Sequence, residues 1–398
     1  MILHDRPATR LATRLAFLIA GFGIASWAPL VPFAKHRLAV DDATLGLLLL
    51  CIGIGSVIAM QFTGALSARY GAKPAIVAGA LGLTVILPFL SVLATPAALA
   101  VALFCFGASL GSLDVAMNIH AVEVERAARR PLMSGFHALY SIGGFAGSTL
   151  MTFLLSSHLE PLTSTLCCAA VMLVALLLAW PRLLAGARGE KGPFFVMPRG
   201  VVLLIAGLAA AAFLTEGALL NWSALLITSA GFVSATKGGV GYMLFSIAMT
   251  IGRLTGDSVT IRIGDRATLF WGGVLAVAGF TVLLTAPFAI LALAGFLLIG
   301  LGASNIVPVL FRKAGSQTVM PPALAISAMT TTGYAGVLAG PAAIGFVSEA
   351  IGLHNAFWML AALICLVPLT ARLVAGSPAG VERTRSLSAS GKATRSQE

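Results

Sequence analysis

Charged residues are scarce in this sequence, where Asp, Glu, Lys and Arg together make up 10% of 398 residues. Soluble domains average about a quarter charged residues, so this composition excludes a soluble enzyme. Cysteine is also rare, and all five cysteines lie inside apolar runs, which argues against a disulfide framework or a metal site. Hydrophobic residues make up 59% of the chain, with a mean hydropathy of +0.99. Disordered, collagen-like and disulfide-stabilised classes are therefore excluded too, and a membrane protein is indicated.

Long apolar stretches make up most of the sequence. A helix needs roughly 20 apolar residues to cross the hydrocarbon core of a bilayer. Twelve stretches of that kind lie at about 14–34, 45–66, 75–94, 97–121, 134–157, 162–184, 200–228, 237–260, 267–286, 288–311, 323–347 and 351–373. The sequence therefore predicts an all-α, polytopic membrane protein with 12 transmembrane helices. The first stretch is too long for the core of a signal peptide, so we expect it to be retained.

Lys and Arg are distributed very unevenly between the two sides of these predicted spans. Of the 25 basic residues, 22 fall on the side that holds both termini. Only Lys35, Arg37 and Lys237 fall on the other side. Short cytoplasmic loops collect positive charge, so we expect both termini in the cytoplasm. The net charge of +11 then reflects topology, and it does not predict nucleic acid as a partner.

A polar stretch divides the predicted spans into six and six. The predicted organisation is an N-terminal six-helix bundle (1–184), a central cytoplasmic loop (185–199), a C-terminal six-helix bundle (200–373) and a disordered cytoplasmic tail (374–398). Weak internal matches support two related halves, since Arg69-Tyr70-Gly71 matches Arg262-Ile263-Gly264 at a separation of 193 residues. Repeated halves with a site at their interface are common in transporter folds.

The loop after the second predicted span carries a family resemblance. Its sequence, Gly64-Ala65-Leu66-Ser67-Ala68-Arg69-Tyr70-Gly71-Ala72-Lys73, resembles the loop motif of the major facilitator superfamily. Ala68 stands where that motif has Asp, whereas the second copy, from Gly256-Asp257 to Asp265-Arg266, keeps its acids. The resemblance implies two pseudo-symmetric six-helix bundles that open a central cavity alternately to each side.

Within that superfamily, two further segments resemble a narrower group. Asp114-Val115-Ala116-Met117-Asn118 is similar to a signature of the fucose-permease-like branch. Glu216-Gly217-Ala218 with Trp222 and His137 resembles the YbjJ/MosC-like proteins of the bacterial inner membrane, although Asn221 stands where that group has an acid. The resemblance implies the same membrane for this chain and favours a sugar, polyol or amino-polyol as the solute.

Two acids, Asp114 and Glu216, lie well inside predicted spans, one in each half. An ionisable group there costs about 2.5 to 3.5 kcal/mol and is a functional-site hypothesis by default. Desolvation favours the protonated carboxyl, so access to water on alternate sides would let such a group load and release a proton. We therefore predict that both acids couple transport to protons. The alternative is that each satisfies a polar group of a neighbouring helix.

Polar and aromatic residues of the same spans are candidates for contacts with the solute. They are Trp27, Asn118, His137, Tyr140, Asn221, Trp222, Asn305 and Tyr334. Helix packing or an interfacial aromatic belt is the alternative for each. Arg69, Arg253 and Asp257 are predicted to act in gating. Arg253 precedes Asp257 by one helical turn, which predicts an ion pair between them.

Enzyme chemistry is disfavoured by the context of the motifs that suggest it. Gly107-Ala108-Ser109-Leu110-Gly111 reads as G-x-S-x-G, but a hydrolase needs that motif between a strand and a helix. His120 and Glu123 lack the second His of a zinc motif, and no phosphate-binding P-loop occurs. We therefore expect no catalytic residue, no metal and no cofactor, with a proton gradient as the energy source.

These observations converge on a proton-coupled secondary transporter of a small polar organic solute. A proton-antiport pump that exports a drug or metabolite is the alternative, since two buried carboxylates suit a cationic cargo. A membrane-embedded sensor that binds a ligand without moving it is the alternative outside transport. The expected partners are the solute, protons and the lipid bilayer, and we expect the protein to act as a monomer.

Overall fold

The computed structural model describes residues 7–40, 42–184, 197–233 and 240–375. Every regular element in these ranges is helical. The elements are α1 (Pro7–Trp27), η1 (Ala28–Leu30), α2 (Val31–Leu38), α3 (Asp42–Tyr70), α4 (Ala72–Leu90), α5 (Pro96–Ala128), α6 (Met133–Ser156), α7 (Pro161–Ala179), η2 (Trp180–Arg182), α8 (Val201–Ser229), α9 (Val240–Thr285), α10 (Ala289–Ala303), α11 (Ile306–Ser316), α12 (Pro322–Ile351), α13 (Leu353–Ile364) and α14 (Leu366–Ala375).

The helices make the twelve predicted crossings. In the described ranges, ten helical segments are long and apolar enough to span a membrane. One of them, α9, turns at Gly264 and supplies two crossings, and α12 adds another with its 30 residues. Two crossings are interrupted, the tenth between α10 and α11 and the twelfth between α13 and α14.

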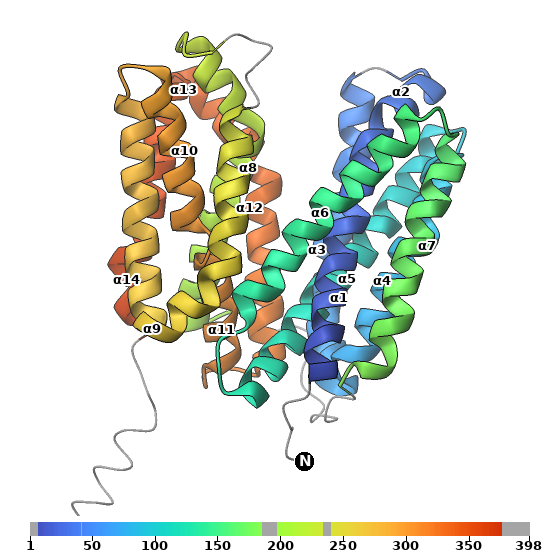
Figure 1. Cartoon of the computed structure of the whole chain (residues 1–398), viewed down its shortest axis with the longest axis horizontal. Coiled ribbons are helices and arrows are strands. Elements are labelled where there is room, and N and C mark those ends of the chain that lie inside the picture. Colours follow the sequence, from blue (N-terminus) through green and yellow to red (C-terminus); the bar gives the residue numbers. More distant parts are fainter. Residues whose placement is uncertain (1–6, 41, 185–196, 234–239, 376–398) are drawn as a thin grey trace, which may run out of the picture.

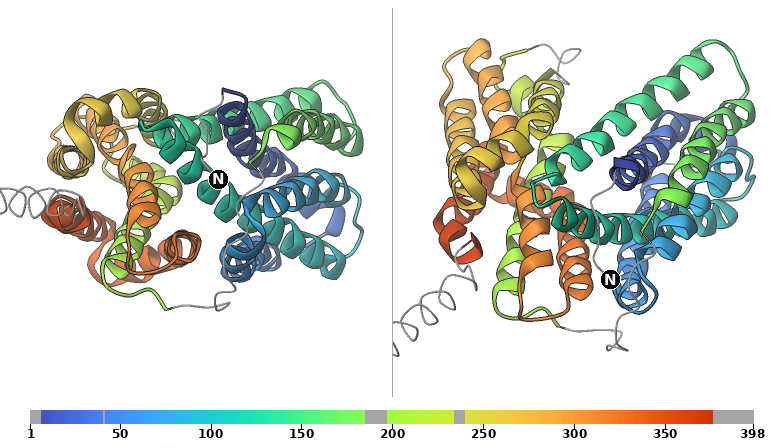
Figure 2. Two further views of the ribbon diagram at one scale, coloured as in Figure 1. Left: turned by 90° about the horizontal axis from the view of Figure 1, so that it is seen from below. Right: turned by 60° about the horizontal axis from the view of Figure 1, so that its bottom comes forward.

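The crossings form two bundles, α1–α7 and α8–α14, which lie side by side (Figure 1). They meet where α3 packs on α12 and where α6 packs on α9. Figures 1 and 2 show them converging at the end where α1 begins, which we call the basic end, and diverging toward α2 and α13. The predicted central loop and tail fall mostly on residues 185–196 and 376–398, which lie outside the described residues.

Two glycines mark the same turn in the two bundles. Gly71, between α3 and α4, has φ 82° and ψ 164°, and Gly264, inside α9, has φ 80° and ψ 164°. Positive φ of this kind is open to glycine and strained for other residues. The two positions are those that the internal sequence match aligned. The repeat therefore extends to the backbone conformation of the turn.

Arg37 is one of three basic residues on the side that is poor in positive charge. Its guanidinium donates hydrogen bonds to the main-chain carbonyls of Leu90, Ser91 and Leu93 at the end of α4. Those carbonyls have no partner within the helix, so the guanidinium caps it. Partial burial lowers the pKa of Arg37 from its ordinary value. Capping α4 gives Arg37 a structural role, which explains a basic residue on the side where Lys and Arg are otherwise rare.

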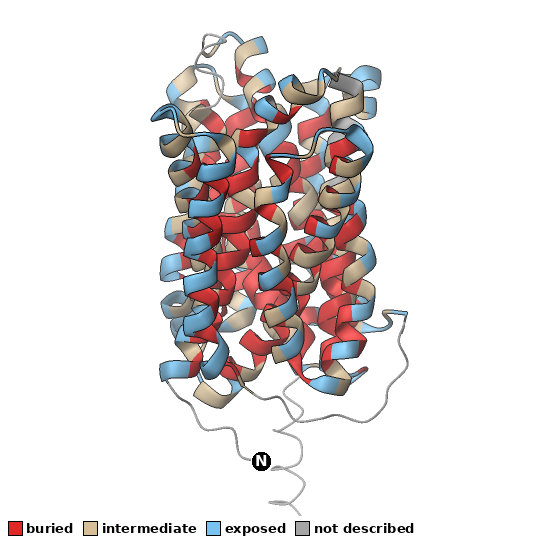
Figure 3. Ribbon diagram, turned by 90° about the vertical axis from the view of Figure 1, so that its right-hand side faces the viewer, coloured by how far each residue is buried: buried red, intermediate tan, exposed pale blue. Residues whose placement is uncertain are grey.

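Small residues let the helices approach closely, while large apolar side chains cover the outside. Buried residues concentrate along the inner faces of the helices and exposed ones on the outer faces (Figure 3). Phe145, Ile290 and Phe346 are each at least 75% exposed, as expected of a surface that contacts lipid. At the crossing of α5 and α3, Gly107 lies directly against the backbone of Ile52. Close contact of this kind drives helix association in membranes, where apolar burial contributes little.

A pair of glycine substitutions tests this packing. In Gly107→Ala, the added Cβ overlaps the Ile52 backbone, so we expect a loss of roughly 1–3 kcal/mol. In Gly207→Ala, on α8, the Cβ has nothing within 4 Å, so we expect no loss and a gain of up to about 1 kcal/mol from helix propensity. Thermal unfolding in detergent measures both. Equal melting temperatures for the two variants would contradict the close contact between Gly107 and the backbone of Ile52.

Candidate functional site

A cavity of about 460 Å³ lies between the two bundles. The N-terminal bundle contributes residues of α1, α3, α5 and α6 to its wall, and the C-terminal bundle contributes residues of α8, α9, α11 and α12. The charged and aromatic members of the lining are Asp114, His137, Tyr140, Phe213, Glu216, Tyr242, Arg253, Phe311 and Tyr334. A pocket with apolar walls and a few convergent polar groups is the usual form of a small-molecule site.

Asp114 lies on α5 and is 7% exposed. The amide of Asn118, one turn on, donates to the main-chain oxygen of Asp114 at 2.9 Å and to its Oδ1 at 3.4 Å. The phenol of Tyr334, from the other bundle, lies close to the same carboxyl. No Lys, Arg or His within the described residues forms an ion pair with Asp114. The carboxyl is thus surrounded by neutral groups.

Glu216 differs from Asp114 in having a cationic partner. Its Oε2 lies 3.8 Å from Nη2 of Arg253 on α9, and its side chain is 34% exposed. Arg253 also donates from Nη1 to Oγ of Ser141 on α6, at 2.9 Å. Because Ser141 belongs to the other bundle, Arg253 connects the two bundles across the cavity. At 3.8 Å the two groups lie too far apart for a direct hydrogen bond, so a polar ligand beside the pair could bridge both members.

His137 and Tyr140 both line the cavity from α6, as the sequence predicted for one face of that span. The His137 ring packs between Phe17 and Phe311, with centroids 5.1 and 5.4 Å away. Its Nε2 atom is buried and has no hydrogen-bond partner. An unsatisfied buried nitrogen is costly, and a polar ligand in the cavity would satisfy it.

Five of the predicted solute contacts do not belong to the cavity lining. Asn118 supports Asp114, as described above. Trp27 is 3% exposed near the end of α1, and Trp222 packs near Gly345 of α12. The amide of Asn221 donates to the main chain of its own helix, at Gly217. The amide of Asn305 donates to the Gly252 carbonyl of α9 at 3.0 Å, so it ties the interruption between α10 and α11 to a neighbouring helix.

An ionic network closes the basic end below the cavity. Arg312 of α11 forms ion pairs with Glu125 of α5 in the other bundle and with Asp265 of its own bundle. Lys313 adds a second cation to Asp265 at 2.7 Å. The sequence analysis did not find this network, because Arg312 and Lys313 read as topological charges and Glu125 lies 187 residues from Arg312 in the chain. These four residues hold α5 against α11 and α9.

The start of α6 is capped by carboxylates from both bundles. Glu125 accepts hydrogen bonds from the main-chain N–H groups of Leu132 and Met133, at 2.6 and 2.8 Å. Asp257 of α9 accepts from those of Ser134 and Gly135, at 3.0 and 2.8 Å. The first N–H groups of a helix have no partner within it and carry partial positive charge, so both carboxylates are stabilised there.

This arrangement corrects one prediction about gating. The sequence predicted an ion pair between Arg253 and Asp257, which lie one turn apart on α9. Arg253 pairs instead with Glu216 beside the cavity, whereas Asp257 caps a helix of the other bundle. The two side chains serve different sites because each finds a partner outside its own helix. Arg69 packs its guanidinium over the ring of adjacent Tyr70, 5.1 Å from the centroid, and its gating role stays a prediction.

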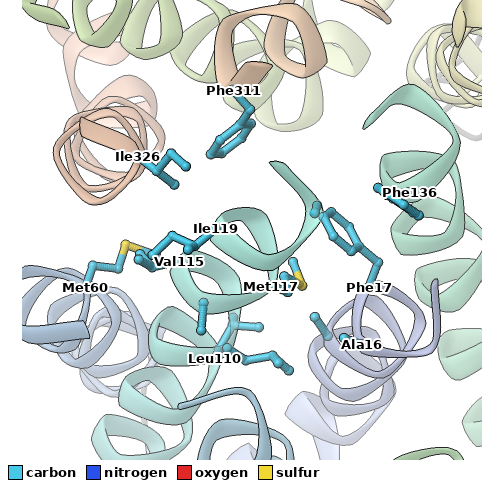
Figure 4. Close-up of a cluster of buried hydrophobic side chains, with 14 of the residues drawn as sticks. Ala16, Phe17, Met60, Leu110, Val115, Met117, Ile119, Phe136, Phe311 and Ile326 are labelled. Atoms are coloured by element: carbon cyan, nitrogen blue, oxygen red, sulfur yellow. The ribbon is translucent and has the colours of Figure 1, made fainter. Parts of the chain in front are cut away.

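An apolar layer separates the cavity from the ionic network. Phe17 and Phe136 stack at 5.9 Å in the N-terminal bundle, and the C-terminal bundle contributes Phe311 and Ile326 to the same buried cluster (Figure 4). All four side chains are at most 1% exposed. The chain order agrees with this position, since Phe311 lines the cavity and the next residue, Arg312, belongs to the network. Water and solute are therefore excluded from the basic end.

Removal of the Arg312 guanidinium tests whether the ionic network holds the two bundles together at the basic end. Loss of one partner of a buried ion pair costs about 3–5 kcal/mol, so Arg312→Gln should separate the bundles at the basic end. Spin labels on cysteines at positions 70 and 263, which are exposed beside the matching glycine turns, report that separation by pulsed electron resonance. Arg262→Gln, an exposed change at the same end, is the matched control. If both variants keep the wild-type distance distribution, the network does not hold the bundles together.

Comparisons with known proteins agree with this architecture. The model of the Major Facilitator Superfamily matches residues 14–318. An MFS-type transporter of Yersinia pestis is 48% identical over 367 residues, which are 92% of this chain and 95% of the relative. Membrane protein MosC of Rhizobium meliloti is 33% identical over 374 residues, 92% of this chain and 90% of MosC.

Among solved structures, that of FucP in the outward conformation aligns with a TM-score of 0.75 and 18% identity, and covers 93% of this chain and 99% of FucP. A second structure describes FucP as the fucose:proton symporter of E. coli. At this level of identity the likeness concerns the fold. The prediction of a fucose-permease-like architecture, with relatives that include MosC, is confirmed.

Proposed function

This chain belongs to the major facilitator superfamily of transporters, and from that membership we propose that it moves a small polar organic solute together with protons. The cavity between the bundles is the site of the solute. Alternating access follows if the bundles, which converge at the basic end, rock about this cavity and open that end while closing the other. The cavity is complete within one chain, so a monomer suffices.

Asp114 is the observation that carries proton coupling. A lone carboxylate at bilayer depth is costly, and the described residues around it supply neutral hydrogen-bonding groups and no cation. Proton binding is then the means of neutralising it whenever the cavity holds little water. We therefore assign Asp114 the role of main proton carrier. Tyr334 approaches this carboxyl from the other bundle. A change in the protonation of Asp114 would therefore alter a contact between the two bundles.

Glu216 has a different part in this proposal. Arg253 already neutralises it in the state described here, so it has less need of a proton than Asp114. A solute hydroxyl beside this ion pair would accept from Arg253 and donate to Glu216, and so bridge the two side chains. Glu216 is therefore primarily a ligand contact, and it becomes a second proton carrier when Arg253 moves away.

The lining suits a neutral or amino-substituted polyol. Tyr140, Tyr242 and Tyr334 offer hydroxyl groups and aromatic faces, and His137 offers a partnerless nitrogen. The description of FucP as a fucose:proton symporter supports a sugar-like solute. A cationic drug is less well matched, since Arg253 offsets one of the two carboxylates.

The proposed orientation places the basic end in the cytoplasm of a bacterial cell and the chain in its inner membrane. The distribution of Lys and Arg supports it. Under this orientation the state described here is outward-facing, in agreement with the likeness to FucP in its outward conformation. The energy source is the proton gradient, with no cofactor and no metal.

A transport assay tests the coupling. Thermal stabilisation of the purified protein by hexoses, inositols, amino-inositols or cationic dyes first identifies a ligand, because binding to the native state raises apparent stability. In proteoliposomes with an imposed pH gradient, Asp114→Asn should abolish uphill accumulation of that ligand while counterflow continues. Glu349→Gln, which removes an exposed acid of α12, should accumulate ligand as the wild type does.

Three results would contradict parts of this proposal. Unchanged uphill accumulation in Asp114→Asn would remove Asp114 from the mechanism. Stabilisation by cationic dyes alone, with proton-driven export, would favour the antiporter. Binding without any flux would favour a sensor.

A further inference from the structure

A second concavity, of about 680 Å³, lies on the outer surface of the C-terminal bundle at the basic end. It lies between the part of α9 that follows Gly264 and α14, which pack together at the left edge of Figure 1, away from the N-terminal bundle. Gly273 of α9 packs directly on Pro368 of α14, which fixes how the two helices meet beside the groove. None of its residues belongs to the cavity between the bundles.

The groove combines two guanidinium groups with a large apolar surface. Arg266 and Arg372 lie on its two walls and are both exposed. Trp271 is 61% and Leu369 75% exposed, and the ring of Phe270 lies edge-on to that of Trp271 at 5.2 Å. Exposed aromatic rings beside arginines are typical of the depth at which lipid headgroups meet acyl chains.

Within the described part of the chain, no acid lines the groove to neutralise these arginines. The nearest carboxylate along the chain, Asp265, is engaged by Arg312 and Lys313 in the ionic network. The groove therefore presents positive charge to its surroundings above an apolar floor. A ligand with an anionic head and apolar chains would complement both properties.

We propose that this groove binds an anionic phospholipid. The phosphate lies between Arg266 and Arg372, where each guanidinium donates to its oxygens, and an acyl chain lies along Trp271 and Leu369. Arginine suits such a phosphate because its planar fork donates two parallel hydrogen bonds. Basic pockets between transmembrane helices recognise anionic headgroups in this way.

The chain's own C-terminal segment is a poorer occupant. Residues 376–398 carry four basic residues and two acids, so their net charge has the same sign as that of the groove. Like charges repel, whereas an anionic lipid neutralises both arginines. Each arginine near the membrane surface contributes about 1 kcal/mol to attraction of anionic lipid, so the pair should favour it over a zwitterionic lipid by roughly 30-fold.

Fluorescence quenching tests the site in the full-length protein. Trp271 is kept as the single tryptophan, and the other four are replaced by Phe. Brominated phosphatidylglycerol or brominated phosphatidylcholine is then titrated into mixed micelles. We expect phosphatidylglycerol to quench Trp271 with about 30-fold higher affinity than phosphatidylcholine. The double variant Arg266→Gln/Arg372→Gln should bring that ratio close to one.

A matched double variant separates a built site from diffuse attraction. Arg199→Gln/Arg262→Gln removes the same charge from exposed positions outside the groove and should keep the preference. Equal losses in the two double variants would overturn the proposal. A chain that ends at residue 375 should quench as the full chain does, and much stronger quenching would assign the groove to the tail. Competition by soluble glycerol phosphate at the lipid's own concentration would identify a free-phosphate site instead.

Discussion

A carboxylate inside an apolar helical bundle is stable only if a cation, a set of N–H groups or a proton neutralises it, and this requirement organises the interface between the two bundles. Glu125 and Asp265 share the guanidinium of Arg312, and Glu216 faces Arg253. Asp257 caps the start of α6. Among these interface acids of the described chain, Asp114 alone has neither an ion pair nor main-chain N–H donors, and only neutral side chains interact with its carboxyl. The first four acids are neutralised within the protein, and we assign the proton to the fifth.

One helix links the cavity to the closed end. Arg253 and Asp257 lie one turn apart on α9, yet the first contacts the cavity and the second holds α6 of the opposite bundle. A ligand that draws Arg253 away from Glu216 or Ser141 therefore acts on the same rigid element that caps α6. The apolar layer adjoins both ends of this link, since Phe311 lines the cavity and Phe136 directly follows Gly135, whose N–H donates to Asp257.

Much of the fold could be predicted because the signals for it are local. Apolar length predicts each crossing, and the paired turns at Gly71 and Gly264 follow from a short repeated motif. Asp114 and Glu216 were evident as acids in apolar runs, and both line the cavity. The partners of Arg312 could not be found in this way, because Glu125 is 187 residues away and no local pattern connects them. Phe213 and Phe311 were missed because an aromatic residue in a span reads equally well as a lipid contact.

The protonation of Asp114 is the central claim, and infrared difference spectroscopy tests it without knowledge of the solute. A protonated carboxyl in an apolar site has a C=O stretch that is separate from those of carboxylate and amide groups. We predict such a band in the purified protein, with an intensity that falls as pH rises, and we predict that Asp114→Asn abolishes it. A band that persists in Asp114→Asn, or a wild type with no protonated carboxyl at any pH at which the protein stays folded, would contradict the account.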